Sequence, residues 1–336
     1  MQFGMIGSGS WATALAKILT DNGNTIHWWM RNADNITYMQ KRRHNAPYLS
    51  GAYFNQQQLN LNNNLSEVVQ NSDVLVIAVP SAYIEDALSQ LNKDALKGKK
   101  IISAIKGILP TDNLLLNDYL IKNFDVAFTD YFTVLGPCHA EEVAAEKLSY
   151  LTFSGLDENT AKSLSVYFST EYINTIVNHD VIGVQYAAVL KNIYALGAGI
   201  AHGLDYGDNF QSVYIANAAS EMATFLKRLV WSKETEEEQR TINYNASVYL
   251  GDLLVTCYSL YSRNRTFGNM IGKGYSVKSA QLELNMVAEG YNASKCVYKT
   301  NLSVQAEIPI VTTIYQILWE QLPADEGFKI IEGLLV

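Results

Sequence analysis

The residue that most clearly could take part in catalysis is Lys191. It lies with Asn192 in the middle of an otherwise apolar stretch from residue 184 to residue 201. Burying an unpaired ammonium group is costly, so a lysine here must face a pocket, pair with an acid or lose its proton. The alternative is a buried stem whose head group reaches water. A partly desolvated lysine can donate a proton during the reduction of a carbonyl group. A lysine at mid-bilayer is expensive, so we expect a helix in a protein core and no membrane span.

A second group of candidate residues lies further along the chain. Asp252 and Thr256 are four residues apart and would share one face of a helix. Arg263-Asn264-Arg265 follows soon after. Arginine suits a phosphate group because its planar guanidinium donates two parallel hydrogen bonds. Taken without context, an exposed arginine–asparagine loop is the alternative interpretation.

Near the N-terminus, Gly7-Ser8-Gly9-Ser10-Trp11-Ala12 forms a GxGxxA pattern between a predicted strand and a predicted helix. The first glycine permits a tight turn, the second lets the backbone approach a pyrophosphate, and Ala12 is small enough for close packing. The pyrophosphate would lie at the helix N-terminus, where free N–H groups and the helix dipole favour an anion. A glycine-rich turn without a ligand is the alternative.

The end of the next predicted strand bears on which dinucleotide is used. A domain selective for NAD usually places an acid there, to bond the ribose 2′-hydroxyl. Here the chain runs Trp28-Trp29-Met30-Arg31-Asn32, and the nearest acid is Asp34. Arg31 could pair with a 2′-phosphate, although an arginine pointing into solvent is the alternative. We therefore expect NADP(H) to be accepted, and use of NAD(H) is compatible with the pattern.

These groups need a scaffold, and the first half of the chain alternates short apolar runs with helical patterns. Such alternation gives a parallel sheet with helices on both faces. From about residue 181 long helical patterns dominate, and a charge run at 234–240 indicates a solvated helix face or loop. We predict an α/β fold: a Rossmann-type dinucleotide-binding domain at 1–180, then an all-helical substrate and catalytic domain at 181–336. The predicted strands are Phe3–Ile6, Thr25–Trp29, Val74–Val79, Ile101–Ile105 and Tyr131–Leu135.

Composition narrows the class of protein further. A formal charge of −8 over 336 residues disfavours nucleic acid as a partner, and the basic stretches, such as Lys41-Arg42-Arg43, are short. The three cysteines, Cys138, Cys257 and Cys296, show no metal-binding spacing. Reduced thiols and a start that runs almost directly into an apolar strand favour a cytoplasmic protein without a leader segment or metal. A homodimer is the default expectation.

Together these residues resemble the bacterial NAD(P)-dependent glycerol-3-phosphate dehydrogenases. Each matching block is weak alone, but their order and spacing through nearly the whole chain are highly specific. The blocks are Gly7–Trp11, Ala78–Ser81, Ile105–Gly107, Gly136–Glu142, Gly183–Gln185, Leu190–Ile193, Gly197–Gly199, Gly251–Cys257, Ser262–Arg265, Phe267–Gly268 and Val287–Tyr291.

The resemblance implies a role for each matching residue. The catalytic residues would be Lys191 as general acid/base, Lys106 near nicotinamide and substrate, and Asp252 as the carboxylate that positions both substrate and lysine. The positive charge of Lys106 would lower the pKa of Lys191. The implied cofactor contacts are Gly7, Gly9, Ser10, Trp11, Arg31, Lys106, Ala140, Arg263, Val287 and Glu289. The implied substrate contacts are Lys106, Gly136, Cys138, Lys191, Asn192, Asp252, Thr256, Ser262, Arg263 and Asn264.

The resemblance also implies an activity, the interconversion of dihydroxyacetone phosphate and sn-glycerol 3-phosphate. This activity would supply glycerol 3-phosphate for phospholipid synthesis. Two positions depart from the family, which usually has basic residues where this chain has Gln211 and Asn217. Two positive charges are therefore missing from a helix expected to flank the pocket. Two other hypotheses stay open: a related reductase of hydroxyacids or ketoacids, with a carboxylate site in place of the phosphate loop, and a non-catalytic nucleotide-binding regulator.

Overall fold

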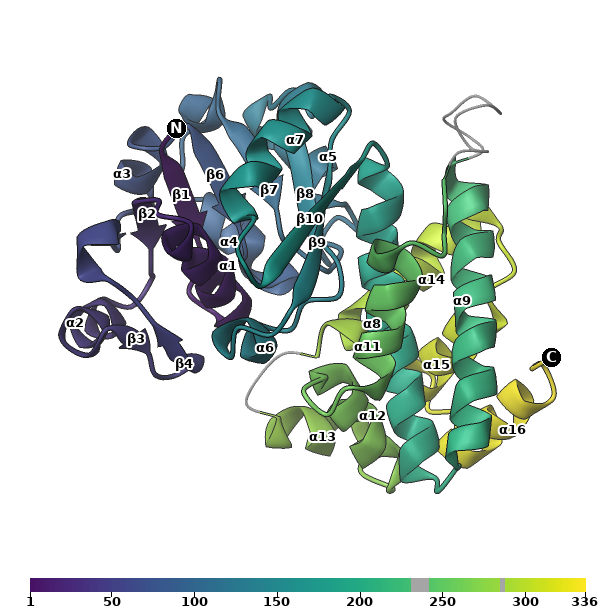
Figure 1. Cartoon of the computed structure of the whole chain (residues 1–336). Helices are drawn as coiled ribbons and strands as arrows, with labels where there is room; N and C mark the ends of the chain where they lie inside the picture. Colours follow the sequence, from purple (N-terminus) through teal and green to yellow (C-terminus); the bar gives the residue numbers. More distant parts are fainter. Residues whose placement is uncertain (231–241, 285–287) are drawn as a thin grey trace. The chain divides into compact units, whose positions relative to one another are not determined.

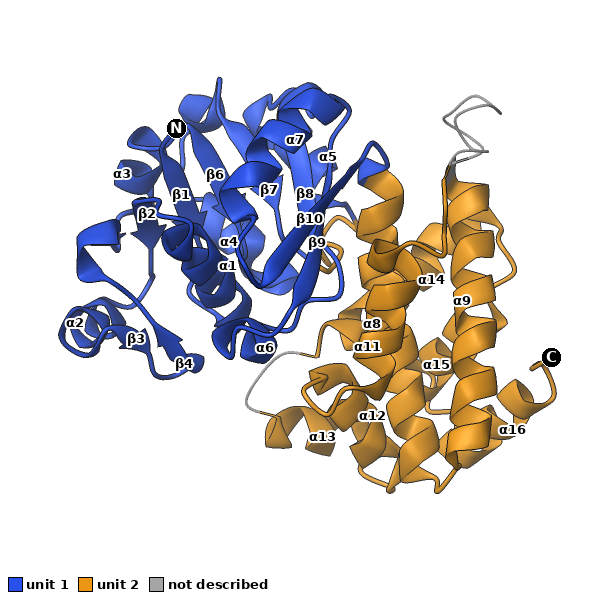
Figure 2. Cartoon of the chain, viewed as in Figure 1, with its two compact units in different colours: residues 1–105, 114–181 blue, residues 106–113, 182–336 orange. Residues whose placement is uncertain are grey.

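The computed structural model describes residues 1–230, 242–284 and 288–336, and the chain forms two compact units (Figure 2). Unit 1 comprises Met1–Ile105 and Leu114–Val181, and unit 2 comprises Lys106–Asn113 and Ile182–Val336. The sequence analysis placed the stretch 106–113 in the first domain, whereas its contacts group it with the helical unit. The predicted charge run at 234–240 lies outside the described residues.

Unit 1 is built on an eight-stranded sheet with the order β10-β9-β8-β7-β6-β1-β2-β5 (Figure 1). Neighbouring strands are parallel except for the antiparallel pair β8 and β9. A separate antiparallel hairpin joins β3 to β4. The strands are β1 (Phe3–Ile6), β2 (Ile26–Trp29), β3 (His44–Asn45), β4 (Leu49–Tyr53), β5 (Leu59–Asn62), β6 (Val74–Ile77), β7 (Lys100–Ser103), β8 (Tyr131–Leu135), β9 (Ser149–Ser154) and β10 (Ile173–Asn178).

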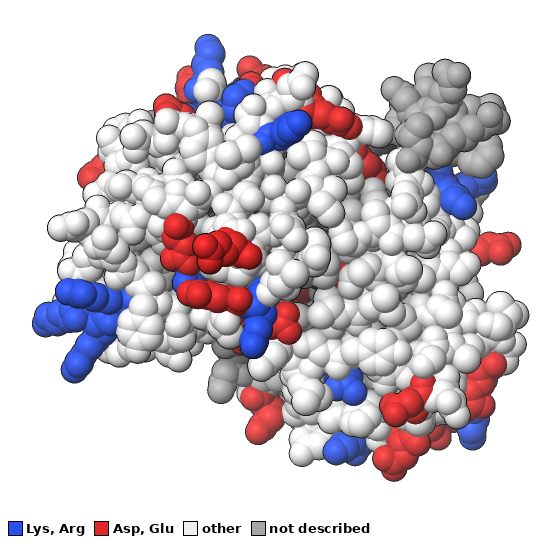
Figure 3. All heavy atoms as spheres, viewed as in Figure 1, with Lys and Arg blue, Asp and Glu red and all other residues white. Residues whose placement is uncertain are grey.

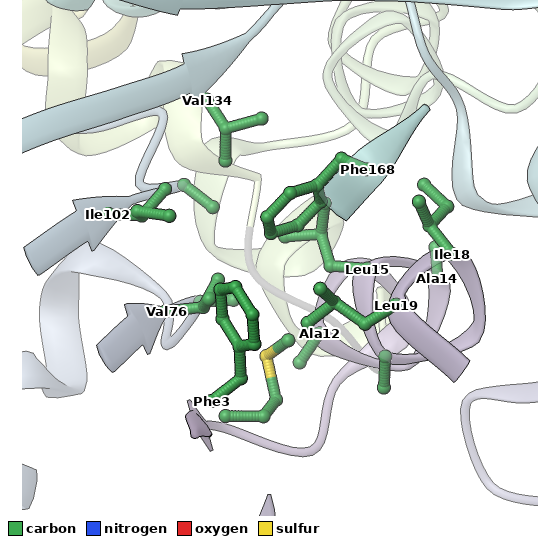
Figure 4. Packing of buried hydrophobic residues seen from close by; sticks show 14 of the residues in the cluster. Phe3, Ala12, Ala14, Leu15, Ile18, Leu19, Val76, Ile102, Val134 and Phe168 are labelled. Atoms are coloured by element: carbon green, nitrogen blue, oxygen red, sulfur yellow. The ribbon is translucent and has the colours of Figure 1, made fainter. Parts of the chain in front are cut away.

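One face of this sheet is covered by an apolar layer that comes from helices far apart in the sequence. Phe3 and Val76 point from the strands toward Leu15 and Leu19 of the first helix, and Phe168 closes the layer (Figure 4). Beyond these strands and helices, the layer includes Val143 of α6. The helices of unit 1 are α1 (Ser10–Asp21), α2 (Ala33–Arg42), α3 (Leu65–Gln70), α4 (Ile84–Leu88), α5 (Leu116–Phe124), α6 (Ala140–Ala144) and α7 (Glu158–Ser165). Short 3₁₀ segments are η1 (Gln56–Gln58), η2 (Ser81–Tyr83), η3 (Lys93–Leu96), η4 (Phe128–Asp130) and η5 (Val166–Phe168).

The opposite face of the sheet is reached by α3, which packs against β1, β2 and β5. Gly4 lies on this face, because a Cβ added to it would meet Ser72 just after α3 at 2.5 Å. The sheet is therefore covered on both faces, and the predicted α/β fold class is confirmed.

In the described part of unit 2 the regular elements are helices, as predicted. They are α8 (Val181–Gly203), α9 (Asp208–Val230), the π-helical turn η6 (Ser247–Gly251), α11 (Asp252–Tyr258), α12 (Arg263–Gly272), α13 (Val277–Glu283), α14 (Glu289–Val304), α15 (Pro309–Trp319) and α16 (Ala324–Glu332). By length and composition α8 could cross a membrane, but 89% of its most apolar window is buried inside the protein. It is placed as a core helix, as the sequence indicated.

Helices α8 and α12 approach each other at glycines. A Cβ on Gly268 of α12 would lie 1.9 Å from the carbonyl oxygen of Leu196, and one on Gly199 of α8 would lie 2.1 Å from that of Arg265. Gly203 and Gly272 face each other one turn further along. Because only glycine allows this backbone contact, these residues fix the N-terminus of α12 beside the middle of α8.

Charged side chains are spread over the surface rather than gathered into one tract on the face shown in Figure 3. Small basic groups alternate there with acidic ones. Lys41 and Arg42, from the basic stretch named above, lie in the last turn of α2.

Candidate active site

The glycine-rich turn follows β1 at the point where the strand order of the sheet reverses, with β6 on one side of β1 and β2 on the other. In open α/β sheets ligands bind outside the carboxyl ends of strands at such a switch point. Gly7 has φ +120°, and a Cβ there would meet the carbonyl oxygen of Ala78 at 2.7 Å. The fold itself therefore requires a glycine at position 7.

Gly9 is a different case. It is the N-cap residue of α1 with φ −72°, which any residue can adopt, and a Cβ there would find no atom within 4 Å. No contact among the described residues requires a glycine at this position, so the space beside Gly9 is available to a ligand. The first turn of α1 carries no acidic residue, Ser10 and Trp11 begin the helix, and Ala12 is fully buried. This is the environment that a pyrophosphate needs.

Arg31 is exposed just beyond the end of β2, and Asn32 caps α2 by accepting a hydrogen bond from the backbone N–H of Asp34 at 2.8 Å. The strand end therefore presents a cation to solvent, while the acid nearest to it lies inside the first turn of the following helix.

A second loop in unit 1 follows β8. Gly136 has φ +135°, and a Cβ there would meet the carbonyl oxygen of Tyr150 at 2.7 Å. Cys138 is buried and forms no disulfide, and Ala140 begins α6. All three cysteines are buried and none forms a disulfide, consistent with the expected reduced thiols.

In unit 2, the structure pairs Lys191 with Asp252. The Lys191 Nζ lies 2.5 Å from Asp252 Oδ1, and the two side chains are 5% and 2% exposed. Burial lowers the pKa of Lys191 to about 8, the Asp252 carboxylate opposes this, and the nearby Lys106 ammonium adds to it. Of the alternatives posed by the sequence, pairing with an acid and loss of the proton are both realised, because Lys191 pairs with Asp252 and is partly discharged near neutral pH.

Asp252 is also left with unused hydrogen-bonding capacity. Its Oδ2 is buried and has no partner among the described residues. Asp252 begins α11 directly after the π-helical turn, and its backbone N–H bonds the carbonyl oxygen of Ser247. π-helical turns occur frequently at functional sites. The free oxygen gives the site a hydrogen-bond acceptor for a substrate hydroxyl group.

A chain of carboxamides connects this pair to its surroundings. Asn192 donates to the carbonyl oxygen of Lys106 at 3.1 Å, and Asn264 donates to Asn192 Oδ1 at 2.9 Å. The backbone N–H of Gly290 donates in turn to Asn264 Oδ1 at 2.9 Å. The amides of Asn192 and Asn264 are therefore engaged in holding elements together, which the sequence did not predict.

The residues predicted to bind the substrate phosphate lie at the N-terminus of α12. Ser262 is the N-cap and accepts from the backbone N–H of Arg265 at 3.3 Å, Arg263 is exposed in the first turn, and Asn264 is buried. Thr256 is turned to its own helix, donating to the carbonyl oxygen of Asp252 at 2.5 Å. Glu289 begins α14, whereas Val287 lies outside the described residues.

The two departures from the family pattern are placed as neutral hydrogen-bonding groups. Gln211 is 5% exposed and donates to the carbonyl oxygen of Cys257 at 3.5 Å. Asn217 donates to the carbonyl oxygen of Val336 at 3.0 Å and accepts from its N–H at 3.2 Å. Asn217 both donates and accepts, which a basic side chain could not do, since a cation has no acceptor.

A cavity of about 300 Å³ opens elsewhere, at the edge of the sheet. It is lined mostly by polar side chains, including His27 of β2, Asn60 and Asn62 of β5, and Asn71 directly after α3. The described residues that line it include no lysine or arginine, so it does not suit a phosphorylated substrate. Among the residues that the structure describes, no group of three or more His, Cys, Asp or Glu is placed to hold a metal ion.

The mostly parallel sheet, the glycine-rich turn and the buried lysine–carboxylate pair together define an oxidoreductase that uses a nicotinamide dinucleotide. Comparison with known proteins identifies the family. Residues 2–161 match the model of the N-terminal part, and residues 180–329 that of the C-terminal part, of NAD-dependent glycerol-3-phosphate dehydrogenase. The chain belongs to this family, and the predicted resemblance is confirmed.

Individual relatives agree with this assignment. The chain is 32% identical to a glycerol-3-phosphate dehydrogenase [NAD(P)+] of Chlorobium phaeobacteroides, over 97% of this chain and 96% of that one. It is 32% identical to the Bacillus subtilis enzyme of the same name, over 94% and 89%. The structure is similar to the crystal structure of the Coxiella burnetii glycerol-3-phosphate dehydrogenase, with a TM-score of 0.88, 26% identity and 98% of both chains covered.

Proposed function

We propose that this protein interconverts dihydroxyacetone phosphate and sn-glycerol 3-phosphate with NAD(H) or NADP(H). The observation that carries the proposal is the buried pair of Lys191 and Asp252, in a chain whose relatives bear the name of this enzyme. A non-catalytic regulator would have no need for a desolvated lysine held by a carboxylate beside a second lysine.

Lys191 is proposed as the general acid/base. When bound, a reduced nicotinamide would supply the hydride for the carbonyl carbon of the ketone. Lys191, protonated, gives its proton to the carbonyl oxygen, and neutral Lys191 takes that proton back in the reverse direction. Its pKa of about 8 keeps both forms accessible near neutral pH. Asp252 Oδ1 holds the ammonium, and Asp252 Oδ2 is free to orient the substrate. Lys106 lowers the pKa of Lys191 by charge repulsion.

For the cofactor, the residues of unit 1 fit a dinucleotide. The open space beside Gly9 and the N-terminus of α1 would hold the pyrophosphate, and Arg31 would pair with a 2′-phosphate. Gly7, Ser10, Trp11, Ala140, Glu289 and Val287 are proposed as further contacts on the strength of the family match.

For the substrate, the first turn of α12 is proposed to bind the phosphate group. Arg263 supplies a bidentate cation, and the helix N-terminus adds backbone N–H groups and a favourable dipole. Ser262, Asn264, Asn192, Thr256, Gly136 and Cys138 complete the proposed set. Asn192 and Asn264 act in it chiefly by holding α8, α12 and α14 together.

The test is the loss of NADPH absorbance with three ketones. We expect turnover with dihydroxyacetone phosphate, very little with unphosphorylated dihydroxyacetone, and none with 2-ketoacids, because phosphate binding orients the reacting carbonyl. Arg263→Ala should raise KM for dihydroxyacetone phosphate strongly, and Arg263→Lys should restore it only in part, since lysine lacks the fork. Preference for a ketoacid would favour a hydroxyacid reductase. Absence of NADPH oxidation with any of the ketones would favour a non-catalytic regulator.

We also propose three properties that concern the protein in its cell. It reduces the ketone to supply glycerol 3-phosphate for phospholipid synthesis, it acts in the cytoplasm, and it forms a homodimer. Family membership supports the first two, as do three buried cysteines that form no disulfide, and the third is the default for soluble oligomers. Sedimentation velocity would test the third, with a single monomeric species as the contrary result.

A further inference from the structure

Each of the three successive carbonyl groups of Gly7-Ser8-Gly9 accepts a hydrogen bond from a buried side chain. Trp28 Nε1 donates to the oxygen of Gly7 at 2.7 Å, Asn45 Nδ2 to that of Ser8 at 2.8 Å, and Thr13 Oγ1 to that of Gly9 at 2.9 Å. The donors come from β2, β3 and α1 respectively. The donor residues are at most 2% exposed, so their side chains are shielded from bulk water.

Asn45 stands at the centre of this arrangement. Its amide nitrogen donates both to Ser8 and to Thr13 Oγ1, each at 2.8 Å. The opposite orientation of the amide would set Oδ1 against the carbonyl of Ser8, so the bonding network fixes which atom is nitrogen. The hairpin that carries Asn45 also receives a bond from the turn, because Ser10 Oγ donates to the carbonyl oxygen of Tyr48 at 2.9 Å.

An anion is repelled by carbonyl oxygens and attracted by N–H groups. A flexible glycine-rich turn can present either to its ligand, because glycine adopts many backbone conformations. Donors that hold all three carbonyls against the protein leave the N–H groups of the turn and of the α1 N-terminus to meet the ligand.

We infer that Asn45 is a positioning residue for the dinucleotide: with Trp28 and Thr13 it ties back the carbonyl groups of the glycine-rich turn and so makes the turn an anion site. This inference rests on the proposed cofactor site at Gly7–Gly9. Asn45 acts through the backbone, at the pyrophosphate that NADH and NADPH share. Its removal must therefore weaken both cofactors alike, unlike a change at Arg31.

The experiment measures dissociation constants of NADH and NADPH by fluorescence titration in the absence of substrate. Asn45→Ala should raise both by about tenfold, corresponding to one hydrogen bond. Asn45→Asp should raise both by about a hundredfold or more, because it replaces the donor with a negative charge beside the bound pyrophosphate. Thr20→Ala is the matched control: Thr20 is also a buried polar residue of this unit, but its hydroxyl bonds the carbonyls of Ala16 and Lys17. Its cofactor constants should not change.

Thr13→Val provides a second and nearly isosteric variant should Asn45→Ala fail to fold, and it should weaken both cofactors in the same way. Wild-type affinity in Asn45→Ala or in Thr13→Val would overturn the inference, as would equal losses in Thr20→Ala. Failure of the wild-type protein to bind either cofactor would instead overturn the proposed cofactor site, so the two failures are distinguishable.

Discussion

At the scale of single residues, Lys191 shows how burial sets chemistry. Its pKa falls because desolvation penalises the ammonium, and it stops at about 8 because Asp252 supports the charge. Neither effect alone would serve catalysis near neutral pH. A fully desolvated lysine would hold no proton to give, and a lysine paired without burial would not release one.

We expect reduction of dihydroxyacetone phosphate to fall as pH rises through about 8, because the proposed acid must be protonated, and the reverse oxidation to rise over the same range. The measurement is kcat/KM against pH in both directions. Lys191→Ala should cost about 10²–10⁴-fold in kcat, with cofactor binding retained. A variant with near-normal kcat would refute the assignment.

Two neighbours of Lys191 should move the midpoint of the pH profile of kcat/KM in opposite directions. Asp252→Asn removes the charge that raises the pKa of Lys191, so the midpoint should shift below the wild-type value. Lys106→Met removes a like charge that lowers this pKa, so the midpoint should shift above it. Shifts of the same sign in both variants would contradict the electrostatic account, whatever the loss in rate.

Arg31 carries the prediction on cofactor choice. Its exposed side chain follows β2 where an acid would repel a 2′-phosphate. Arg31→Ala should reduce kcat/KM with NADPH far more than with NADH, since only NADPH carries the extra phosphate. Equal losses with both cofactors, or none, would show that Arg31 does not contact the 2′-phosphate.

Lys191 could be singled out from sequence because a cation in an apolar helix needs an explanation. Its pairing with Asp252 could not, since only the fold brings residues so distant in sequence to 2.5 Å. Asn45 gave no local signal at all. It lies in a short polar stretch of sequence, and its importance comes from the β3–β4 hairpin, which contacts the glycine-rich turn.

At the scale of secondary structure elements, apolar runs located the central strands well. Tyr131–Leu135 was predicted with its exact bounds, because a strand buried on both faces reads as a continuous apolar run. β5, β9 and β10 were missed, since they lie toward the sheet edges and mix polar with apolar residues, as in Leu59-Asn60-Leu61-Asn62. The antiparallel pairing of β8 and β9 was likewise outside what alternation predicts.

The contact of α8 with α12 supports a prediction at this scale. Gly268→Ala would place a methyl group 1.9 Å from the Leu196 carbonyl oxygen, so the helices must separate. We expect a loss of about 1–3 kcal/mol in stability, together with a fall in activity, because Lys191 and Arg263 lie on the two helices. The control is Gly207→Ala, where an added Cβ has no atom within 4 Å. Denaturant unfolding and kcat/KM are the measurements, and equal effects in both variants would contradict the packing argument.

At the scale of the whole molecule, the sequence predicted a parallel-sheet part followed by a helical part. It did not predict that the chain enters the helical unit at residues 106–113 before returning to complete the sheet with β8–β10. This excursion gives Lys106, which directly follows the sheet unit in sequence, a place beside Lys191. No local pattern marks such a crossing, because it is defined by contacts between distant segments.

The two glycines of the turn should separate the stability of the chain from its stabilisation by cofactor. Gly7→Ala should lower the Tm of the protein alone, because it forces φ +120° on alanine and a contact of 2.7 Å with Ala78. Gly9→Ala should leave that Tm nearly unchanged, since its φ is ordinary and its Cβ meets nothing. A ligand at about 100 times its Kd adds about 2.7 kcal/mol to the free energy of unfolding, so NADPH should raise the Tm of the wild type.

Gly9→Ala should lose most of this rise in Tm, because the methyl group fills the space proposed for the pyrophosphate, whereas Lys191→Ala should keep it and lose turnover. The measurement is thermal unfolding of all four proteins with and without NADPH. A full NADPH response in Gly9→Ala would place the cofactor elsewhere. A lowered Tm of that variant without ligand would mean that the second glycine, like the first, is there for the fold.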